Sequence, residues 1–197
     1  YWKRFLNIKE VFGKVAVAFL PTVILGLVFY KIIKKFLLGN YLVVLFTLLI
    51  GGIFILLFEK YYQAEKANID SIEKISWKQA VIIGLCQSVA MVPGVSRSAA
   101  TIIGGLSLKI KREIIVEFSF LLAVPTMLAA SGLDLFKSSF NFGVEEWGML
   151  GLGFLTAFLS ALVVIRWFLR FVQTHDFKIF GWYRIILALI LLVVFFI

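Results

Sequence analysis

The sequence contains very few of the residues that build metal clusters and disulfides, and few charges. Among its 197 residues there are one cysteine, Cys86, and one histidine, His175, and only 16% of the residues are charged. One cysteine cannot form a disulfide within the chain, so it says nothing about the redox compartment. Because there is no cluster of Cys and His side chains, we do not expect a zinc site.

Hydrophobic residues, by contrast, are abundant. They make up 62% of the chain and include 21 phenylalanines, whereas soluble globular domains are about 45–50% apolar. This composition indicates an integral membrane protein. The formal net charge of +9 would suggest nucleic-acid binding in a soluble protein. Here the positive-inside rule and the anionic headgroups of the bilayer explain it, and no nucleic-acid partner is expected.

Five segments are long and apolar enough to cross the hydrocarbon core of a bilayer, which takes roughly 17–25 residues. They are residues 12–31, 41–59, 114–136, 147–169 and 180–197. The connections near 31–40, 137–146 and 170–179 carry the charged and turn-forming residues that are typical of loops. We therefore predict an all-α polytopic membrane protein with about five transmembrane helices.

Residues 79–108 consist of two apolar halves that are each too short to span. Residues 79–92 and 98–108 lie on either side of Pro93-Gly94, a pair that ends a helix and permits a sharp turn. Non-helical backbone within a membrane is tolerated only where protein or a water-filled cavity surrounds it. We predict a re-entrant helix-loop-helix hairpin over 79–108, and the alternative is a single broken spanning helix.

The distribution of positive charge separates these two alternatives. If the hairpin returns to its own side, fifteen of the 20 Lys and Arg residues lie on one face, in segments 1–14, 60–78, 109–112 and 166–184, and four lie on the other. If residues 79–108 span instead, the bias disappears. The positive-inside rule therefore favours the re-entrant hairpin and predicts that the C-terminus lies outside.

A faint internal repeat suggests inverted topology. Residues 12–28 resemble 147–163, and 41–50 resemble 183–192, although apolar segments also match by chance. Three spans after each hairpin would give the inverted-repeat bundle found in many transporters. The counterpart of the hairpin would then precede residue 1, and since the chain does not begin with Met, we expect it to be truncated at its N-terminus.

This repeat also predicts how the chain is divided. We expect one integral membrane domain over 1–197, in which 1–60 end the first repeat, 61–78 form a cytoplasmic loop and 79–197 form the second repeat.

The turn itself, "PGVSRS" at 93–98, has the chemistry of an anion site. Gly94 permits the turn, and Ser96 or Ser98 is placed to cap the second half-helix. The N-terminus of that helix presents unpaired N–H groups and a positive dipole end. Arg97 adds a guanidinium whose planar donors match phosphate oxygens, and the hydroxyl of Thr101 lies within one turn of it.

Each of these residues also has a plainer interpretation. Arg97 could snorkel to the interface from a capped turn, although a charge buried between two non-spanning halves is by default a candidate functional residue. Glu117 could pair with Arg97, bind a cation, or be an interfacial carboxylate. Gln87 is either a packing polar group or part of the site lining. Asp134 is expected to be an interfacial charge at a helix end.

Beyond these properties, the chain resembles a known family over essentially its whole length. The stretch "PGVSRSAAT" and the following "EFSFLLAVPTMLAASGLDL" carry the resemblance, with "SWKQAVIIGLCQSVAMVPG" and "WFLRFVQTHDFKIFGWYRIILALILL" on the flanks. These segments are similar to the undecaprenyl-pyrophosphate phosphatase family, the bacitracin-resistance proteins of bacterial inner membranes. The resemblance implies an inverted-repeat fold with two re-entrant hairpins and an active site approached from the outer side.

The resemblance also implies the function and its residues. Such proteins remove the terminal phosphate of undecaprenyl pyrophosphate, which recycles the lipid carrier of peptidoglycan synthesis. By position, Ser96, Arg97 and Ser98 would form the catalytic signature that engages the pyrophosphate. Gly94, Thr101, Gln87 and Glu117 are further candidates for substrate binding. We expect multi-pass insertion in the inner membrane and leave open whether the protein forms a homodimer.

One signature of the family is missing from this sequence. Members carry a glutamate-rich stretch that ends in Ser-Ser-Thr-Gly-His, and its residues are expected to hold a divalent cation, Mg or Ca, and to carry out acid–base or nucleophilic work. No such stretch occurs in the 197 residues. The expected mechanism is metal-assisted attack on the terminal phosphorus, with the metal ligands outside this chain, so we expect the chain alone to be inactive.

Three other functions compete with this interpretation. The Ser-Arg pair also suggests the vanadium-haloperoxidase-like lipid phosphatases, but these need a His six residues after the arginine, where this chain has Ile103. A polyprenyl-phosphate flippase or transporter would share the inverted repeat and broken helices. A structural membrane subunit would use the arginine as a packing charge only.

Overall fold

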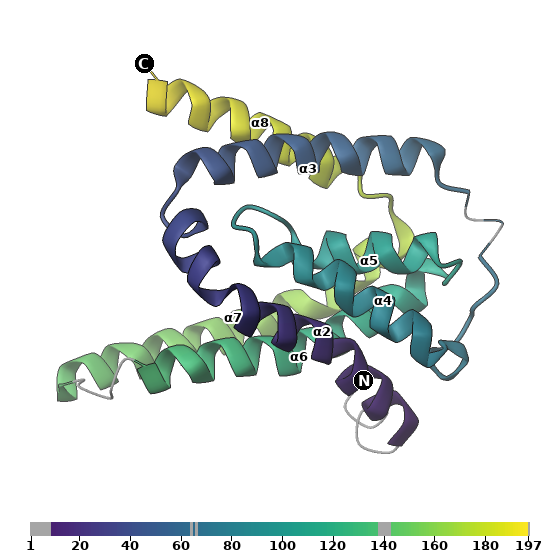
Figure 1. The fold of residues 1–197 in the computed structure, drawn as a ribbon, viewed down its shortest axis with the longest axis horizontal. Helices are drawn as coiled ribbons and strands as arrows, with labels where there is room; N and C mark the ends of the chain where they lie inside the picture. The colour runs from purple at the N-terminus through teal and green to yellow at the C-terminus, as the bar shows by residue number, and fades with distance from the viewer. Residues whose placement is uncertain (1–8, 64, 66, 138–142, 197) are drawn as a thin grey trace.

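The computed structural model describes residues 9–63, 65, 67–137 and 143–196, and these are mostly helical (Figure 1). Its long helices are α2 (Lys9–Ile32), α3 (Tyr41–Tyr61), α6 (Arg112–Lys137), α7 (Val144–Thr174) and α8 (Lys178–Phe196). Two short helices, α4 (Trp77–Ser88) and α5 (Arg97–Ser107), lie between α3 and α6 in the sequence. Single turns of other helix types follow α2 (η1, Ile33–Leu37), precede α4 (η3, Ile72–Lys74) and follow α4 (η4, Val89–Met91).

The five long helices confirm the predicted spans. In the part of the chain that the structure describes, these five are long and apolar enough to cross a membrane. The side chains of α7 between residues 145 and 165 that the structure describes are all exposed, as expected for a helix that faces lipid. The protein is therefore an all-α, multi-pass membrane protein.

The first predicted loop, at 31–40, is mostly helical instead. The lysines of this segment continue α2 into η1, and the helix ends only at Leu37. Gly39 then adopts a left-handed φ of 83°, and the Asn40 side chain caps α3 by accepting from the N–H groups of Leu42 and Val43. The break therefore depends on the Gly-Asn pair, because lysine is compatible with a helix and a left-handed glycine is not.

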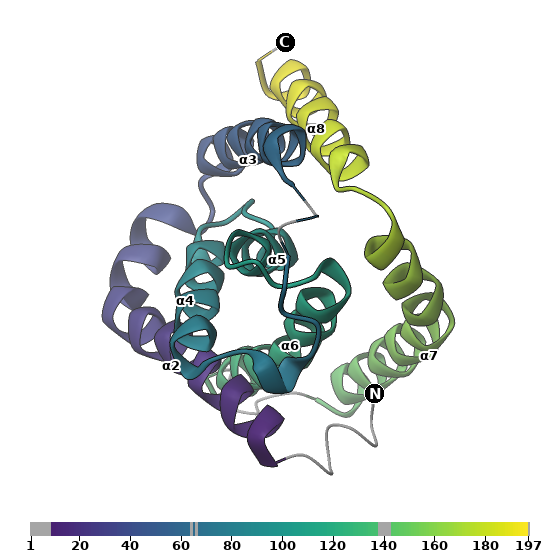
Figure 2. The ribbon, with the colours of Figure 1, turned by 90° about the vertical axis from the view of Figure 1, so that its right-hand side faces the viewer.

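Helices α4 and α5 form the hairpin that the two short apolar halves predicted. Ser76 begins α4 with a capping box to Gln79, and the Gln79 side-chain amide donates to the Leu108 carbonyl just beyond α5 (3.4 Å). The open ends of the hairpin therefore lie together, and the turn at Pro93-Gly94 lies at the opposite end. In Figure 2, α5 lies near the middle of the molecule with α4 and α6 beside it, and α2 lies outside them.

Glycines permit two close helix contacts. Gly84 of α4 packs directly on the backbone of Ala18 in α2, where an added Cβ would overlap the Ala18 carbonyl. Gly52 of α3 meets Gly181 of α8 in the same way, since a Cβ on Gly52 would lie 2.8 Å from the Gly181 oxygen. Small residues of this kind let membrane helices approach and gain dispersion contacts. They fix α4 on α2 and pair α3 with α8.

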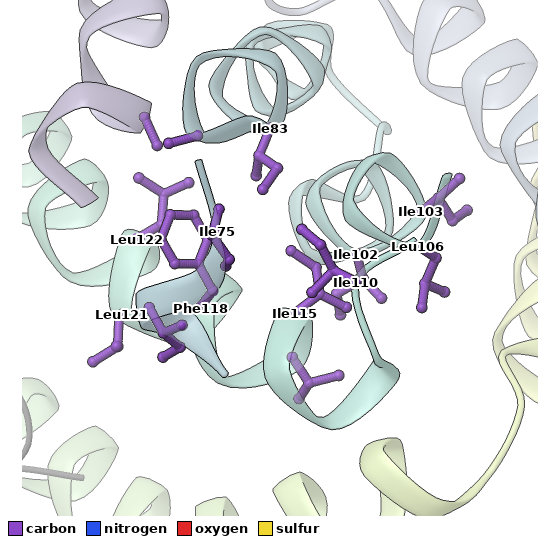
Figure 3. Close-up of a cluster of buried hydrophobic side chains, with 14 of the residues drawn as sticks. Ile75, Ile83, Ile102, Ile103, Leu106, Ile110, Ile115, Phe118, Leu121 and Leu122 are labelled. Carbon is purple, nitrogen blue, oxygen red and sulfur yellow. The ribbon is translucent and has the colours of Figure 1, made fainter. Parts of the chain in front are cut away.

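The apolar core lies under the hairpin, between α4, α5 and α6 (Figure 3). Ile83 of α4, Ile102 of α5 and Phe118 of α6 are at most 1% exposed. Ile75, in the segment before α4, also packs into this cluster. The hairpin is therefore held along its length by packed side chains, which restricts the position of its turn.

This packing makes Gly84→Ala destabilising. The added methyl group overlaps the Ala18 backbone, so α2 and α4 must separate, and overpacking of this kind costs about 1–3 kcal/mol. Gly148→Ala in α7 is the matched control, because nothing lies within 4 Å of its added Cβ and alanine favours a helix over glycine by up to about 1 kcal/mol. Thermal unfolding in detergent should give a lower midpoint for Gly84→Ala and an unchanged or higher one for Gly148→Ala. Equal midpoints would contradict the close contact.

Candidate anion-binding site at the hairpin turn

The hairpin turn is built around Pro93 and Gly94. Gly94 has a φ of 88°, a left-handed conformation that glycine adopts readily and other residues rarely do. The N–H of Val95 donates to the Val92 carbonyl (3.1 Å) and closes the turn. A Cβ on Gly94 would overlap the Thr47 hydroxyl and approach the Val44 oxygen to 2.9 Å. The turn is therefore seated directly on α3.

Donors from two other helices satisfy the carbonyl groups of the turn. The Thr47 hydroxyl of α3 lies 2.7 Å from the Pro93 oxygen, and the Arg184 guanidinium of α8 donates to the Gly94 oxygen. Thr47 lies within the candidate span Tyr41–Tyr61, so the turn lies beside a membrane-spanning segment. Unpaired backbone groups are costly in apolar surroundings, and these two contacts remove that cost.

Ser96, one of the two serines that the sequence offered as a cap, caps α5. Its hydroxyl accepts from the Ala99 N–H (3.2 Å), and its carbonyl accepts from the Ala100 N–H (3.0 Å). The exposed Ser98 hydroxyl lies 3.3 Å from that of Ser96. The positive end of the α5 dipole and two hydroxyl groups therefore meet at the turn.

Arg97 points toward α6. The half-buried guanidinium donates to the Ala123 carbonyl (3.3 Å) and lies 3.6 Å from the Met127 sulfur. These contacts begin six residues beyond Glu117 on the same helix, which is about 9 Å along its axis. The contact with Glu117 that the sequence suggested for Arg97 is thus replaced by contacts with a carbonyl and a thioether. Glu117 itself is buried, 6% exposed.

A second arginine, Arg184, lies at the turn, and the sequence-based prediction had counted it among the charges of a cytoplasmic loop. That assignment is wrong, because Arg184 is the seventh residue of α8 and contacts the turn through Gly94 and the Thr47 carbonyl (3.5 Å). Its Nε is buried without a hydrogen-bond partner. The signal was present in the sequence, since Arg184 stands alone in the apolar run "YRIILALILL".

Two cavities meet beside the turn. The larger, of about 530 Å³, lies between α3, α4 and α5, and the smaller, of about 220 Å³, lies between α5, α6, α7 and α8. Both are lined mainly by apolar side chains, and the first has a volume within the usual range of ligand pockets. Four residues line both cavities: Ile55, Ser96, Ala99 and Arg184. Ser96 and Arg184 therefore both face each of the two cavities.

The other sequence-predicted residues are divided between the cavities and the helix contacts. Ser98 lines the smaller cavity. Thr101 is fully buried and shares a 2.5 Å hydrogen bond with Ser119 of α6. Gln87 is 1% exposed and its amide donates to Thr22 of α2 and Thr126 of α6. Thr101, Gln87, Arg97 and Glu117 line neither cavity.

The residues at the turn do not fit the divalent cation that the resemblance implies. Its ligands would be carboxylates and other oxygen donors, whereas the turn brings together arginines, hydroxyl groups and N–H groups. Over residues 9–63, 65, 67–137 and 143–196, no three His, Cys, Asp or Glu side chains are grouped so as to hold a metal ion. Donors of this kind suit an anion rather than a cation.

The structure defines a multi-pass helical membrane protein with a broken hairpin, at whose turn the hydroxyl groups and N-terminus of α5 lie beside Arg184 of α8. The family model for "Bacitracin resistance protein BacA" matches residues 4–190. An undecaprenyl-diphosphatase of Aquifex aeolicus is 45% identical over 190 residues, which are 96% of this chain and 74% of the relative. One of Methanococcus aeolicus is 40% identical over 195 residues, 99% of this chain and 76% of the relative. The chain belongs to the BacA/undecaprenyl-diphosphatase family.

The seating of the turn on α3 makes Gly94→Ala more harmful than the same change at Gly39. Both glycines have a left-handed φ, which costs an alanine about 1–2 kcal/mol. Only at Gly94 does the new methyl group also meet neighbouring atoms, because nothing lies within 4 Å of it at Gly39. In detergent, Gly94→Ala should lower the thermal midpoint clearly more than Gly39→Ala. If the two variants unfold together, the turn does not contact α3 as described.

Proposed function

We propose that the chain binds undecaprenyl pyrophosphate through its pyrophosphate group at the hairpin turn and supplies the anion-binding part of an undecaprenyl-diphosphatase. The observation that carries this proposal is the meeting of Ser96, Arg184 and the α5 N-terminus at the junction of two apolar cavities. A phosphate group finds donors there, and a long isoprenoid chain finds apolar walls within the bilayer.

The proposal includes a re-entrant position for the hairpin. Helices α4 and α5 have 12 and 11 residues, or less than 20 Å each, whereas the hydrocarbon core is about 30 Å thick. The contact between Gln79 and Leu108 supports entry and exit on one face. Because Arg184 lies within α8, the inner face carries one positive charge fewer than predicted. The positive-inside bias remains, and it supports an outer C-terminus.

The helix bounds support an inverted repeat as well. Helix α3 begins at Tyr41 and α8 begins at Lys178. This offset of 137 residues is close to the offset of 135 in the sequence match between 12–28 and 147–163. In this arrangement, the hairpin with α6, α7 and α8 forms the second repeat, and α2 and α3 end the first.

At the turn, the chain's own residues would bind and orient the phosphate groups. Arg184 and the free N–H groups at the start of α5 donate to the phosphoryl oxygens, and the hydroxyls of Ser96 and Ser98 add further donors. Arg97 can exchange its long contacts with Ala123 and Met127 for a phosphate oxygen. In hydrolysis, the bond between the terminal phosphorus and the bridging oxygen of the pyrophosphate breaks. Donors held in place in this way stabilise the negative charge that builds up on the phosphate oxygens as it does so.

We propose that the serines act as ligands and that the chain alone does not hydrolyse its substrate. An attacking serine needs a base to take its proton, and the partners of the Ser96 hydroxyl are the Ala99 N–H and the Ser98 hydroxyl. The glutamate-rich stretch ending in Ser-Ser-Thr-Gly-His, which the family resemblance assigns to acid–base and metal-binding work, does not occur in the sequence.

Binding and phosphate release can be measured separately. The 197-residue protein in detergent should bind undecaprenyl pyrophosphate more tightly than undecaprenol, which has the same chain without phosphate, and should release no inorganic phosphate. Equal affinity for the two lipids would refute the anion site. Release of phosphate by the purified chain would refute its inactivity. The alternative function, a polyprenyl-phosphate flippase, would be favoured if a full-length relative moved undecaprenyl phosphate across vesicle membranes and hydrolysed no pyrophosphate.

Arg97→Lys tests the role of the guanidinium. Lysine keeps the charge but loses the planar pair of donors, and hydrogen bonds to charged groups contribute about 1.5–3 kcal/mol. We expect about a tenfold or greater loss of affinity for undecaprenyl pyrophosphate, with little change in the thermal midpoint. Arg170→Lys, at an exposed position of α7, is the matched control and should bind as the wild type does. An unchanged affinity in Arg97→Lys would make this arginine a packing charge.

A further inference from the structure

Thr47 is the residue of α3 that lies closest to the hairpin turn. Its hydroxyl oxygen is within hydrogen-bond distance of three carbonyl oxygens: Val43 (2.8 Å), Val44 (3.0 Å) and Pro93 (2.7 Å). The first two belong to its own helix, and the third belongs to the turn. Neither the composition of α3 nor the family resemblance singles out this threonine.

A hydroxyl has one hydrogen to donate, so the three acceptors compete for it. Val43 and Val44 lie in the first turn of α3, and the backbone N–H groups four residues further along the helix already serve their carbonyls. Pro93 lies between η4 and α5, outside any helix, and the donor that the structure gives its carbonyl is Thr47. The hydroxyl therefore matters most to the Pro93 oxygen, which is also the nearest of the three.

The contact is reinforced by shape. Gly94 packs so closely on Thr47 and Val44 that a Cβ could not be placed between them. Arg184 fixes the adjoining Gly94 carbonyl from α8. Ser96, which caps α5, follows two residues after Gly94. A displacement of the Pro93 carbonyl would therefore shift the first N–H groups of α5 and the two serines relative to Arg184.

We propose that Thr47 is a positioning residue for the anion site, which holds the turn so that the α5 N-terminus and Arg184 can bind the same phosphate group. This inference rests on the proposed function, because it assumes that the turn binds a pyrophosphate. Thr47 acts through the Pro93 carbonyl, so its hydroxyl contributes to the binding of phosphate and not to the binding of the isoprenoid chain.

Thr47→Val tests this role, because valine keeps the shape of threonine and removes the hydroxyl. Thr47→Ser keeps the hydroxyl and should restore binding. Thr156→Val in α7 is the matched control, since the Thr156 hydroxyl also lies close to the carbonyls three and four residues earlier (3.0 and 2.9 Å) but has no partner in the turn. Affinities for undecaprenyl pyrophosphate and undecaprenol would be measured for all four proteins in detergent.

We expect Thr47→Val to lower the affinity for undecaprenyl pyrophosphate by about three- to tenfold, the effect of one hydrogen bond, and to leave the affinity for undecaprenol unchanged. Thr47→Ser and Thr156→Val should bind both lipids as the wild type does. Hydrogen exchange in a peptide covering residues 92–100 should be faster in Thr47→Val alone.

The possible failures can be told apart. A wild-type protein that does not distinguish the two lipids overturns the proposed function. A wild type that distinguishes them, together with a Thr47→Val variant that distinguishes them equally well, overturns the positioning role. Equal losses for both lipids in Thr47→Val would also overturn it, because they would show that Thr47 supports the cavity wall or the fold.

Discussion

The structure depends on one constraint: a chain that breaks its helix in apolar surroundings must find donors for the carbonyl groups that the break exposes. At the hairpin turn these groups belong to Pro93 and Gly94, and their donors are Thr47 and Arg184. Both donors come from helices that are distant in sequence from the turn. The break is therefore stabilised by α3 and α8, and the candidate anion-binding groups that follow it depend on the same two helices.

Two glycine contacts bring these parts together. Gly52 and Gly181 let α3 and α8 approach, so that Thr47 and Arg184 lie side by side, and Gly84 lets α4 pack on the Ala18 backbone of α2. Lipid offers no hydrophobic drive for helices to associate, so close packing of this kind must supply it. The pair α3 and α8 thus provides the donors for the turn, and the packing of α4 on α2 positions the helix that leads into the turn.

Much of the fold could be predicted from the sequence, because it follows from local patterns. The five spans follow from the length and composition of the apolar runs, the hairpin follows from Pro93-Gly94 between two short halves, and the cap follows from the two serines, Ser96 and Ser98, after the break. The linker predicted at 31–40 is mostly helical, because its lysines are compatible with a helix and only the left-handed Gly39 and the following Asn40 separate α2 and η1 from α3.

The site could be predicted only in part, because it depends on contacts between distant helices. Arg97 was singled out by its position in the turn, but its direction toward Ala123 is set by the packing of α5 on α6. Arg184 was counted as a loop charge although it stands alone in an apolar run, and its contact with the turn depends on how α8 packs beside α3. The burial of Thr101 and Gln87 likewise depends on partners in α6 and α2.

The two arginines finally explain why an anion suits this site. The hydrogen-bond partners that the structure gives Arg97 and Arg184 are carbonyl oxygens and a thioether sulfur, with no carboxylate among them. Carbonyl groups satisfy a guanidinium's donors but leave its charge uncompensated, and an uncompensated charge within a membrane protein is costly. A ligand that carries several negative charges removes this cost for both arginines at once. In the proposed function, the attraction for a pyrophosphate would therefore arise as much from the lack of a carboxylate partner for these arginines among the described residues as from the donors that surround the turn.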